Sequence, residues 1–126
     1  MTINNRGLRG QPNLPYTDNR SYAGADVFVD LAYLDHTNSP VTPTSITYQL
    51  DDITNAMNMI PATALTPSGP TQTLQIPGST MQMTYPAVAQ GSQLCQLLVT
   101  AVLPDGSPNA TAKSVSIIEL VAIQTP

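Results

Sequence analysis

The sequence predicts a single all-β domain, built as a sandwich or a small barrel. Apolar residues recur with a period of two in several short runs, turn residues such as proline, glycine and asparagine separate these runs, and none has a convincing helical pattern. The chain has 126 residues, 41% of them hydrophobic, which is enough for one core of ordinary size. We therefore expect an N-terminal arm over residues 1–22 and one domain over residues 23–126.

The first segment is predicted to be extended, because Gly7, Gly10, Pro12 and Pro15 interrupt a polar stretch without sustained periodicity. The first 25 residues carry a formal charge of +2, whereas the rest of the chain carries −6. An arm of this kind suits contact with an acidic protein surface, such as the body of a neighbouring copy. The candidate partner-binding residues are Arg6, Leu8, Arg9, Leu14, Tyr16 and Arg20.

Two regular strands follow the arm. Residues 25–34 alternate between apolar and more polar positions, so Asp26 and Asp30 share the face that points away from the core. Residues 44–51 alternate in the same way, after a turn cluster at residues 35–40. Both segments are typical of half-buried strands.

The next segment, residues 51–60, has two interpretations. Its apolar spacing fits a helical turn after an aspartate cap, but we favour a short strand over residues 57–60 that ends before Pro61. Two more short strands are expected around residues 74–76 and 81–85, each bounded by turn residues.

The strongest strand pattern covers residues 93–103, which we expect to be central in a sheet and buried on both faces. The last strand is predicted over residues 113–123. Its apolar residues change from odd to even positions at Ile117 and Ile118, which indicates a β-bulge there. A helical turn within residues 110–122 remains an alternative.

The residues that could carry chemistry do not form a recognisable catalytic arrangement. His36 is the only histidine and follows Asp35 in a predicted turn, while Cys95, the only cysteine, lies on the apolar face of the strongest strand. Asp51 and Asp52 are adjacent and should point to opposite faces of an extended chain. We therefore expect no enzyme activity and no catalytic residues.

Metal and cofactor binding are not expected either. Two Met-x-Met pairs, Met57 with Met59 and Met81 with Met83, have a spacing that can bind soft copper ions, but filling of a core or an interface explains them as well. The sequence lacks a phosphate-binding loop, a dinucleotide-binding fingerprint and a metal-spaced cysteine–histidine set. The acidic body also disfavours nucleic-acid binding.

The start of the chain lacks the apolar region of a signal peptide, and no apolar run is long enough to cross a bilayer. We therefore expect synthesis in the cytoplasm of the cell that makes the protein and no membrane partner. A single cysteine rules out a disulfide within the chain.

Three segments of the sequence resemble small immunoglobulin-like proteins encoded among the virion genes of tailed bacteriophages. The segments are Pro43-Thr44-Ser45-Ile46-Thr47-Tyr48-Gln49-Leu50-Asp51-Asp52, Leu74-Gln75-Ile76-Pro77-Gly78 and Leu97 to Leu103. The similarity covers about residues 26–123 and leaves the arm outside it. It implies an immunoglobulin-like β-sandwich of about seven strands and a structural protein of a phage particle.

We thus expect a virion protein, made in the host cytoplasm, that binds other virion proteins and occurs in several copies. A capsid-associated decoration, cement or accessory protein is the leading interpretation. Two alternatives stay open: a head-to-tail connector or tail component, and a receptor- or carbohydrate-binding module that uses loops such as residues 35–43 or 66–71. The absence of tryptophan leaves few aromatic platforms for a sugar.

Overall fold

The computed structural model describes residues 2–8, 20–82, 92–104 and 110–121, and these residues form eight strands and no helix. The all-β class predicted from the sequence is confirmed. The strands are β1 Thr2–Leu8, β2 Arg20–Tyr22, β3 Val27–Leu34, β4 Ser45–Asp52, β5 Met57–Leu65, β6 Thr71–Ile76, β7 Ser92–Leu103 and β8 Ala110–Val121.

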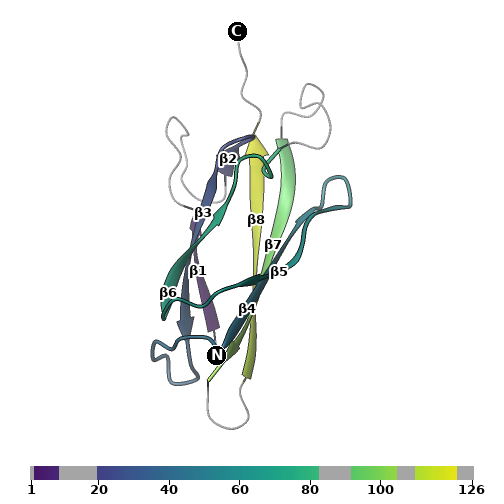
Figure 1. The fold of residues 1–126 in the computed structure, drawn as a ribbon. Helices are drawn as coiled ribbons and strands as arrows, with labels where there is room; N and C mark the ends of the chain where they lie inside the picture. The colour runs from purple at the N-terminus through teal and green to yellow at the C-terminus, as the bar shows by residue number, and fades with distance from the viewer. Residues whose placement is uncertain (1, 9–19, 83–91, 105–109, 122–126) are drawn as a thin grey trace.

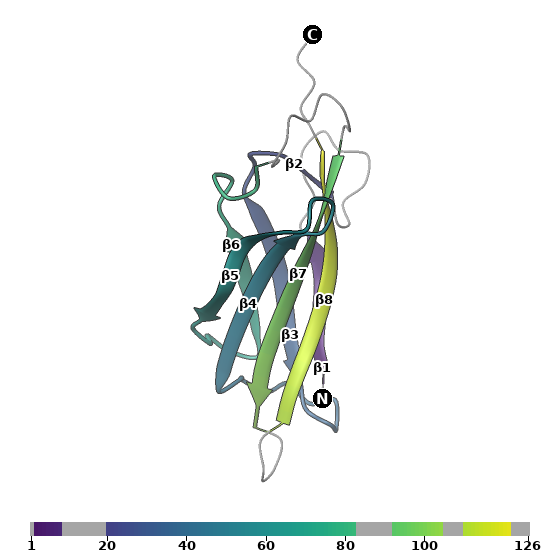
Figure 2. The same cartoon turned by 90° about the vertical axis from the view of Figure 1, so that its right-hand side faces the viewer.

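The strands form two sheets that face each other (Figure 1), an arrangement compatible with a β-sandwich. The smaller sheet has the order β1-β3-β6 and the larger has the order β2-β8-β7-β4-β5. All neighbouring strands are antiparallel except β2 and β8, which are parallel. Figure 2 shows β4, β7 and β8 side by side with β3 behind them.

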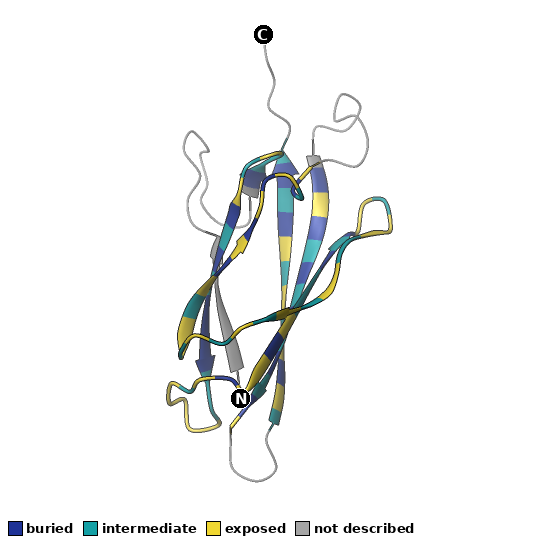
Figure 3. Ribbon diagram, in the orientation of Figure 1, coloured by how far each residue is buried: buried dark blue, intermediate teal, exposed yellow. Residues whose placement is uncertain are grey.

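The hydrophobic core lies between the two sheets and follows the predicted period of two. In β3 and β7 the odd-numbered apolar residues point inward, and each is at most 1% exposed. Figure 3 shows this alternation as changes of colour along the strands. The fully buried residues of these two strands are Val27, Val29, Leu31, Tyr33, Cys95, Leu97, Val99, Ala101 and Leu103.

Strand β7 is central in its sheet, as predicted. It pairs along its whole length with β8 and over residues 95–102 with β4. The expectation that both of its faces are buried is wrong, because its even-numbered residues point away from the core and Leu94 is 39% exposed. No second layer among the described residues covers this outer face.

The β-bulge predicted at Ile117 and Ile118 is also wrong. The pairing of β7 with β8 runs without a register shift from Ser92 opposite Val121 to Leu103 opposite Ala110. Ile118 is buried on the inner face, whereas Ile117 is exposed on the outer face. The change of parity in the sequence therefore marks apolar residues on both faces of one regular strand. The continuous pairing with β7 also excludes a helical turn over residues 110–121.

Strand β5 continues through Pro61 to Leu65, so the prediction that Pro61 ends this strand is wrong. β5 is an edge strand, where the missing N–H of a proline need not interrupt the pairing. Its register with β4 shifts on both sides of the Leu50–Ile60 pair, which leaves Pro61 in an irregular stretch of the edge. Residues 53–56 form the preceding turn, and the helical alternative for residues 51–60 is not observed.

Met81 lies after a turn at residues 78–80 and not in a strand, while Met83 and Tyr85 lie outside the described residues. The extended arm over residues 1–22 is not confirmed. Thr2–Leu8 pairs with β3 as an edge strand, and Arg20–Tyr22 pairs with the end of β8. Weak periodicity in these segments is compatible with edge strands, since such strands need no apolar residues on their free side.

Two adjacent leucines of β7 allow a test of which face of the strand is buried in the core. Leu97 is fully buried, whereas Leu98 points outward and is half-buried. We expect Leu97→Ala to lower the free energy of unfolding by about 2–5 kcal/mol, because it leaves a cavity in the core. Leu98→Ala should cost less than half as much in the same urea titration, and equal losses would contradict the assignment of the faces.

Candidate functional site

The exposed hydrophobic residues are concentrated on one sheet. All the described large hydrophobic side chains that are exposed belong to the five-stranded sheet or to its β4–β5 turn. They are Ile53, Met57, Leu94, Val115 and Ile117, with exposed fractions of 43, 47, 39, 56 and 38%. The outward positions of β3 and β6 in the smaller sheet have no such residue among those whose exposure is described. Leu94, Val115 and Ile117 lie on the outer side of the larger sheet, which makes that side the candidate functional surface, whereas Met57 shares the face of Asp52.

The centre of this surface is formed by the outward residues of β7 and β8, which we call the β7–β8 face. It consists of Leu94, Gln96, Leu98 and Thr100 of β7 and Lys113, Val115, Ile117 and Glu119 of β8. The register places Leu98 opposite Val115, so that these two side chains and Ile117 lie together. Lys113 and Glu119 lie at the two ends of the β8 row, and the apolar residues are between them.

This face differs from the prediction from the sequence, although the sequence contains one signal for it. Val115 and Ile117 were assigned to the opposite side of the strand from Ile118, and a bulge was used to reconcile them. The buried inner residues Ala112, Ile118 and Leu120 share one parity, which a regular strand would place on a single face. That parity alone leaves Val115 and Ile117 outward.

The structure does not bring the predicted partner-binding residues into one described cluster. Arg6 and Leu8 belong to β1, where Leu8 is opposite Val29. Arg20 belongs to β2 and is opposite Glu119 of β8, next to one end of the β7–β8 face. The remaining three, Arg9, Leu14 and Tyr16, lie outside the described residues.

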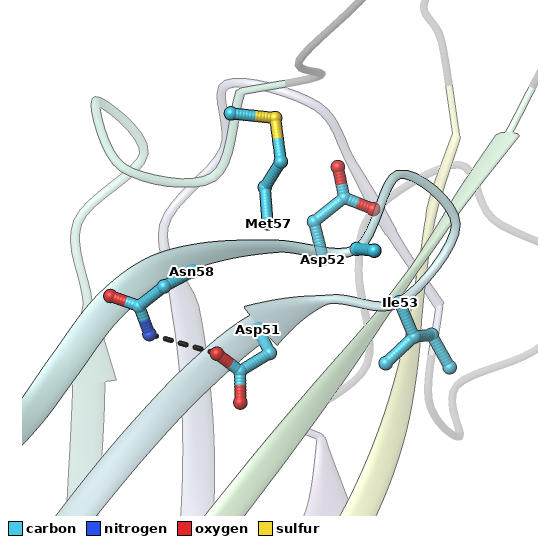
Figure 4. Close-up of a pocket in the computed structure, with 6 residues that line it drawn as sticks. Asp51, Asp52, Ile53, Met57 and Asn58 are labelled. Carbon is cyan, nitrogen blue, oxygen red and sulfur yellow. Dashed lines mark hydrogen bonds between the residues drawn. The ribbon is translucent and has the colours of Figure 1, made fainter.

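A shallow pocket of about 380 Å³ lies at the β4–β5 turn (Figure 4). It is lined by Asp51, Asp52, Ile53, Ala56, Met57 and Asn58. The two aspartates point to opposite sides of the strand, as predicted, and do not form a carboxylate pair. Asp51 accepts hydrogen bonds from the side-chain amides of Asn58 at 2.8 Å and Gln49 at 3.0 Å.

Asp52 is fully buried and organises the turn. One of its carboxylate oxygens accepts the backbone N–H of Asn55 at 3.0 Å, and the other accepts the Asn55 side-chain amide at 2.8 Å. The turn then requires a positive φ of 55° at Ala56. Both carboxylates of the pocket thus stabilise the hairpin, which gives the pocket a structural explanation.

A small group of sulfur and amide atoms lies near this turn, because Cys95 of β7 is opposite Asp52. The Cys95 thiol donates to the Met59 sulfur at 3.5 Å, and the Gln93 amide lies 3.7 Å from the thiol and 3.9 Å from the thioether. Burial raises the pKa of Cys95 to about 11, the Gln93 hydrogen bond lowers it, and the charge of Asp52 raises it. The thiol is therefore protonated at neutral pH, which makes it a poor nucleophile.

His36 and Asp35 lie in the turn after β3. Asp35 Oδ1 accepts hydrogen bonds from the Thr37 hydroxyl at 2.6 Å, the Thr37 N–H at 2.8 Å and the Ser39 N–H at 3.0 Å. The Thr37 hydroxyl is the largest cause of a lowered Asp35 pKa. This carboxylate closes the turn, as is common for an aspartate at such a position.

Metal sites and membrane-spanning helices are both absent from the described part of the chain. No group of three or more His, Cys, Asp or Glu residues there could hold a metal ion. None of its segments forms a helix that is long and apolar enough to span a membrane.

Comparison with known proteins found no match to a protein-family model, a curated protein or a solved structure.

The environment of Cys95 predicts a dependence of stability on alkaline pH. An unfolded thiol loses its proton near the ordinary pKa of 9.0, but the folded protein retains it up to about 11. The folded state thus binds more protons in this interval, so the free energy of unfolding should fall as the pH rises from about 9 to about 11.

The control is Cys95→Ala, which removes the thiol. Between pH 9 and 10, the free energy of unfolding measured with urea should fall less steeply for this variant than for the wild type. Tyr33 contributes mainly above pH 10, because burial raises its pKa from 10.0 to about 12. Equal slopes for the two proteins would contradict the assignment.

Proposed function

We propose that this chain is a non-enzymatic structural protein of a bacteriophage particle, which binds other virion proteins through the β7–β8 face. The observation that carries the proposal is the gathering of the exposed Leu94, Val115 and Ile117 side chains on the outer side of a single sheet. Covering the exposed side chains of Val115 and Ile117 with another protein lowers the free energy, since burial of apolar surface is favourable. The sequence resemblance supports the virion as the setting.

As part of this proposal, we interpret the fold as immunoglobulin-like. In immunoglobulin variable domains the sheet containing strands G, F and C is extended by C′, while A, B and E belong to the other sheet. The orders β8-β7-β4-β5 and β1-β3-β6 correspond to these two sets when the strands are assigned in chain order. The β7–β8 face would then lie on the F and G strands.

The surrounding surface is also suited to contact with protein. The outward residues next to the apolar ones are mostly uncharged, among them Gln96 and Thr100 of β7 and Thr47 and Gln49 of β4. Uncharged polar residues lose less hydration free energy on burial than charged ones. A capsid-associated decoration, cement or accessory role fits such a surface, because this role needs one face that another virion protein covers.

The N-terminal segment is proposed as a second contact. Its positive charge complements the acidic body of the same chain in a neighbouring copy. Because Thr2–Leu8 pairs with β3, deletion of the whole segment would remove a strand as well as a contact. Substitution of Arg9, Leu14 and Tyr16 together by serine is a cleaner test of this part of the proposal.

Incorporation into particles tests the proposed function. An epitope-tagged chain would be produced during growth of the phage that encodes it, and the particles would be purified on a density gradient and immunoblotted. We expect the wild-type chain in the particle band and at least about tenfold less of Val115→Asp/Ile117→Asp, since charge on a binding face opposes its burial.

The matched control is Thr71→Asp, an exposed position on the smaller sheet, which should be incorporated like the wild type. Thermal unfolding of each variant would verify that the fold is intact. Absence of the wild-type chain from particles would contradict the virion role, and equal incorporation of the double variant would contradict the role of the face. Labelled antibody in electron micrographs distinguishes capsid from connector and tail.

A further inference from the structure

The charges of the β7–β8 face are arranged so that the face complements a copy of itself. Along β8 the outward residues read Lys113, Val115, Ile117 and Glu119, and Ser116 marks the midpoint of this row. The positive and negative ends are equally distant from Ser116, and apolar residues occupy the positions between them. A copy turned end for end therefore places each charged end of this row over an end of opposite sign.

We infer that the β7–β8 face binds a second copy of this chain, stacked face to face about a twofold axis that crosses β8 at the level of Ser116. The inference rests on the proposed function, in that it takes this face as a binding surface. It goes further in naming the occupant and its orientation. The stacked β8 strands would run antiparallel, with Val115 of each copy over Ile117 of the other.

The charges select the antiparallel orientation. With the axis perpendicular to β8, Lys113 of each copy lies over Glu119 of the second copy, which forms two attractive pairs. With the axis parallel to β8, Lys113 would face Lys113 and Glu119 would face Glu119. Exposed ion pairs contribute little affinity, so they serve mainly to set the orientation, and the apolar residues between them provide most of the binding.

The neighbouring strands are compatible with the same axis. Leu97 of β7 and Leu50 of β4 lie at the level of Ser116. The twofold rotation therefore places Leu98 over Gln96 and Leu94 over Thr100 of the second copy. On β4 it places Gln49 over Asp51, an amide over a carboxylate. Among the outward residues of β4, β7 and β8, no two like charges face each other, and Arg20 of β2, opposite Glu119, is the basic residue next to this end of the face.

Sedimentation velocity on the full chain tests the inference. We expect the dimer fraction to rise over a concentration range of about 1 to 100 µM, as for an interface of modest size. Lys113→Glu should weaken the dimer by about tenfold, because it places two carboxylates opposite each other at both ends of the interface. Glu119→Lys should weaken it similarly, and Thr71→Lys on the smaller sheet should have no effect.

Mixing the two charge variants tests whether these charges face each other across the interface. Each variant alone has two repulsive pairs, but a heterodimer of Lys113→Glu with Glu119→Lys has two attractive pairs, one as in the wild type and one with the signs exchanged. We expect the mixture to dimerise close to the wild-type level. A dimer fraction in the mixture that stays as low as in the single variants would overturn the proposed register. The thermal stability of each variant is measured separately, so that a disturbed fold can be recognised.

Spin labels report the orientation directly. Cys95 is fully buried, so a label would attach to an introduced Thr111→Cys on the outer side of β8. The antiparallel stack places the two labelled backbones about 35 Å apart, whereas a parallel stack places them about 10 Å apart. Electron paramagnetic resonance measures the separation of the two labels. A separation that fits the parallel stack would overturn the inference.

The outcomes separate this inference from the proposed function. A chain that remains monomeric to about 0.5 mM but enters particles through Val115 and Ile117 would overturn the dimer and leave the virion role standing. A chain that dimerises with the predicted charge dependence but is absent from particles would overturn the virion role and leave the dimer standing.

Discussion

The unbroken pairing of β7 with β8 is the constraint on which the rest of the structure depends. Twelve consecutive residue pairs fix the parity of both strands at once, so a side chain in either strand cannot change face without its neighbours. Because Cys95 and Ile118 face the core, Leu98, Val115 and Ile117 must face away from it. The apolar outer surface is thus a direct result of the register that buries the core.

Much of the fold could be predicted from the sequence. Strands β3, β4, β6 and β7 have one apolar face each, and the period of two locates them within a few residues. The strands that were missed or misplaced lack this pattern for physical reasons. β1 and β2 pair along edges, where apolar alternation is weak, and β5 passes through Pro61, which edge pairing tolerates.

The candidate site could be predicted only in part. Sequence patterns treat each apolar residue as a core residue, so Val115 and Ile117 led to a bulge and not to a surface. Which side of a sheet is covered depends on the second layer, and that layer is formed by segments distant in sequence. The roles of Asp35 and Asp52 as hydrogen-bond acceptors within turns likewise follow from local geometry that composition does not show.

Pro61 has a further consequence for how copies of this chain associate. A free sheet edge offers backbone donors to any extended segment, and repeated pairing of edges leads to open-ended fibres. At the β5 edge a residue without an N–H interrupts that row of donors, and the irregular register bends the strand near it. Association is thereby directed from the edge to the face, where a twofold contact closes on itself and the assembly stops growing.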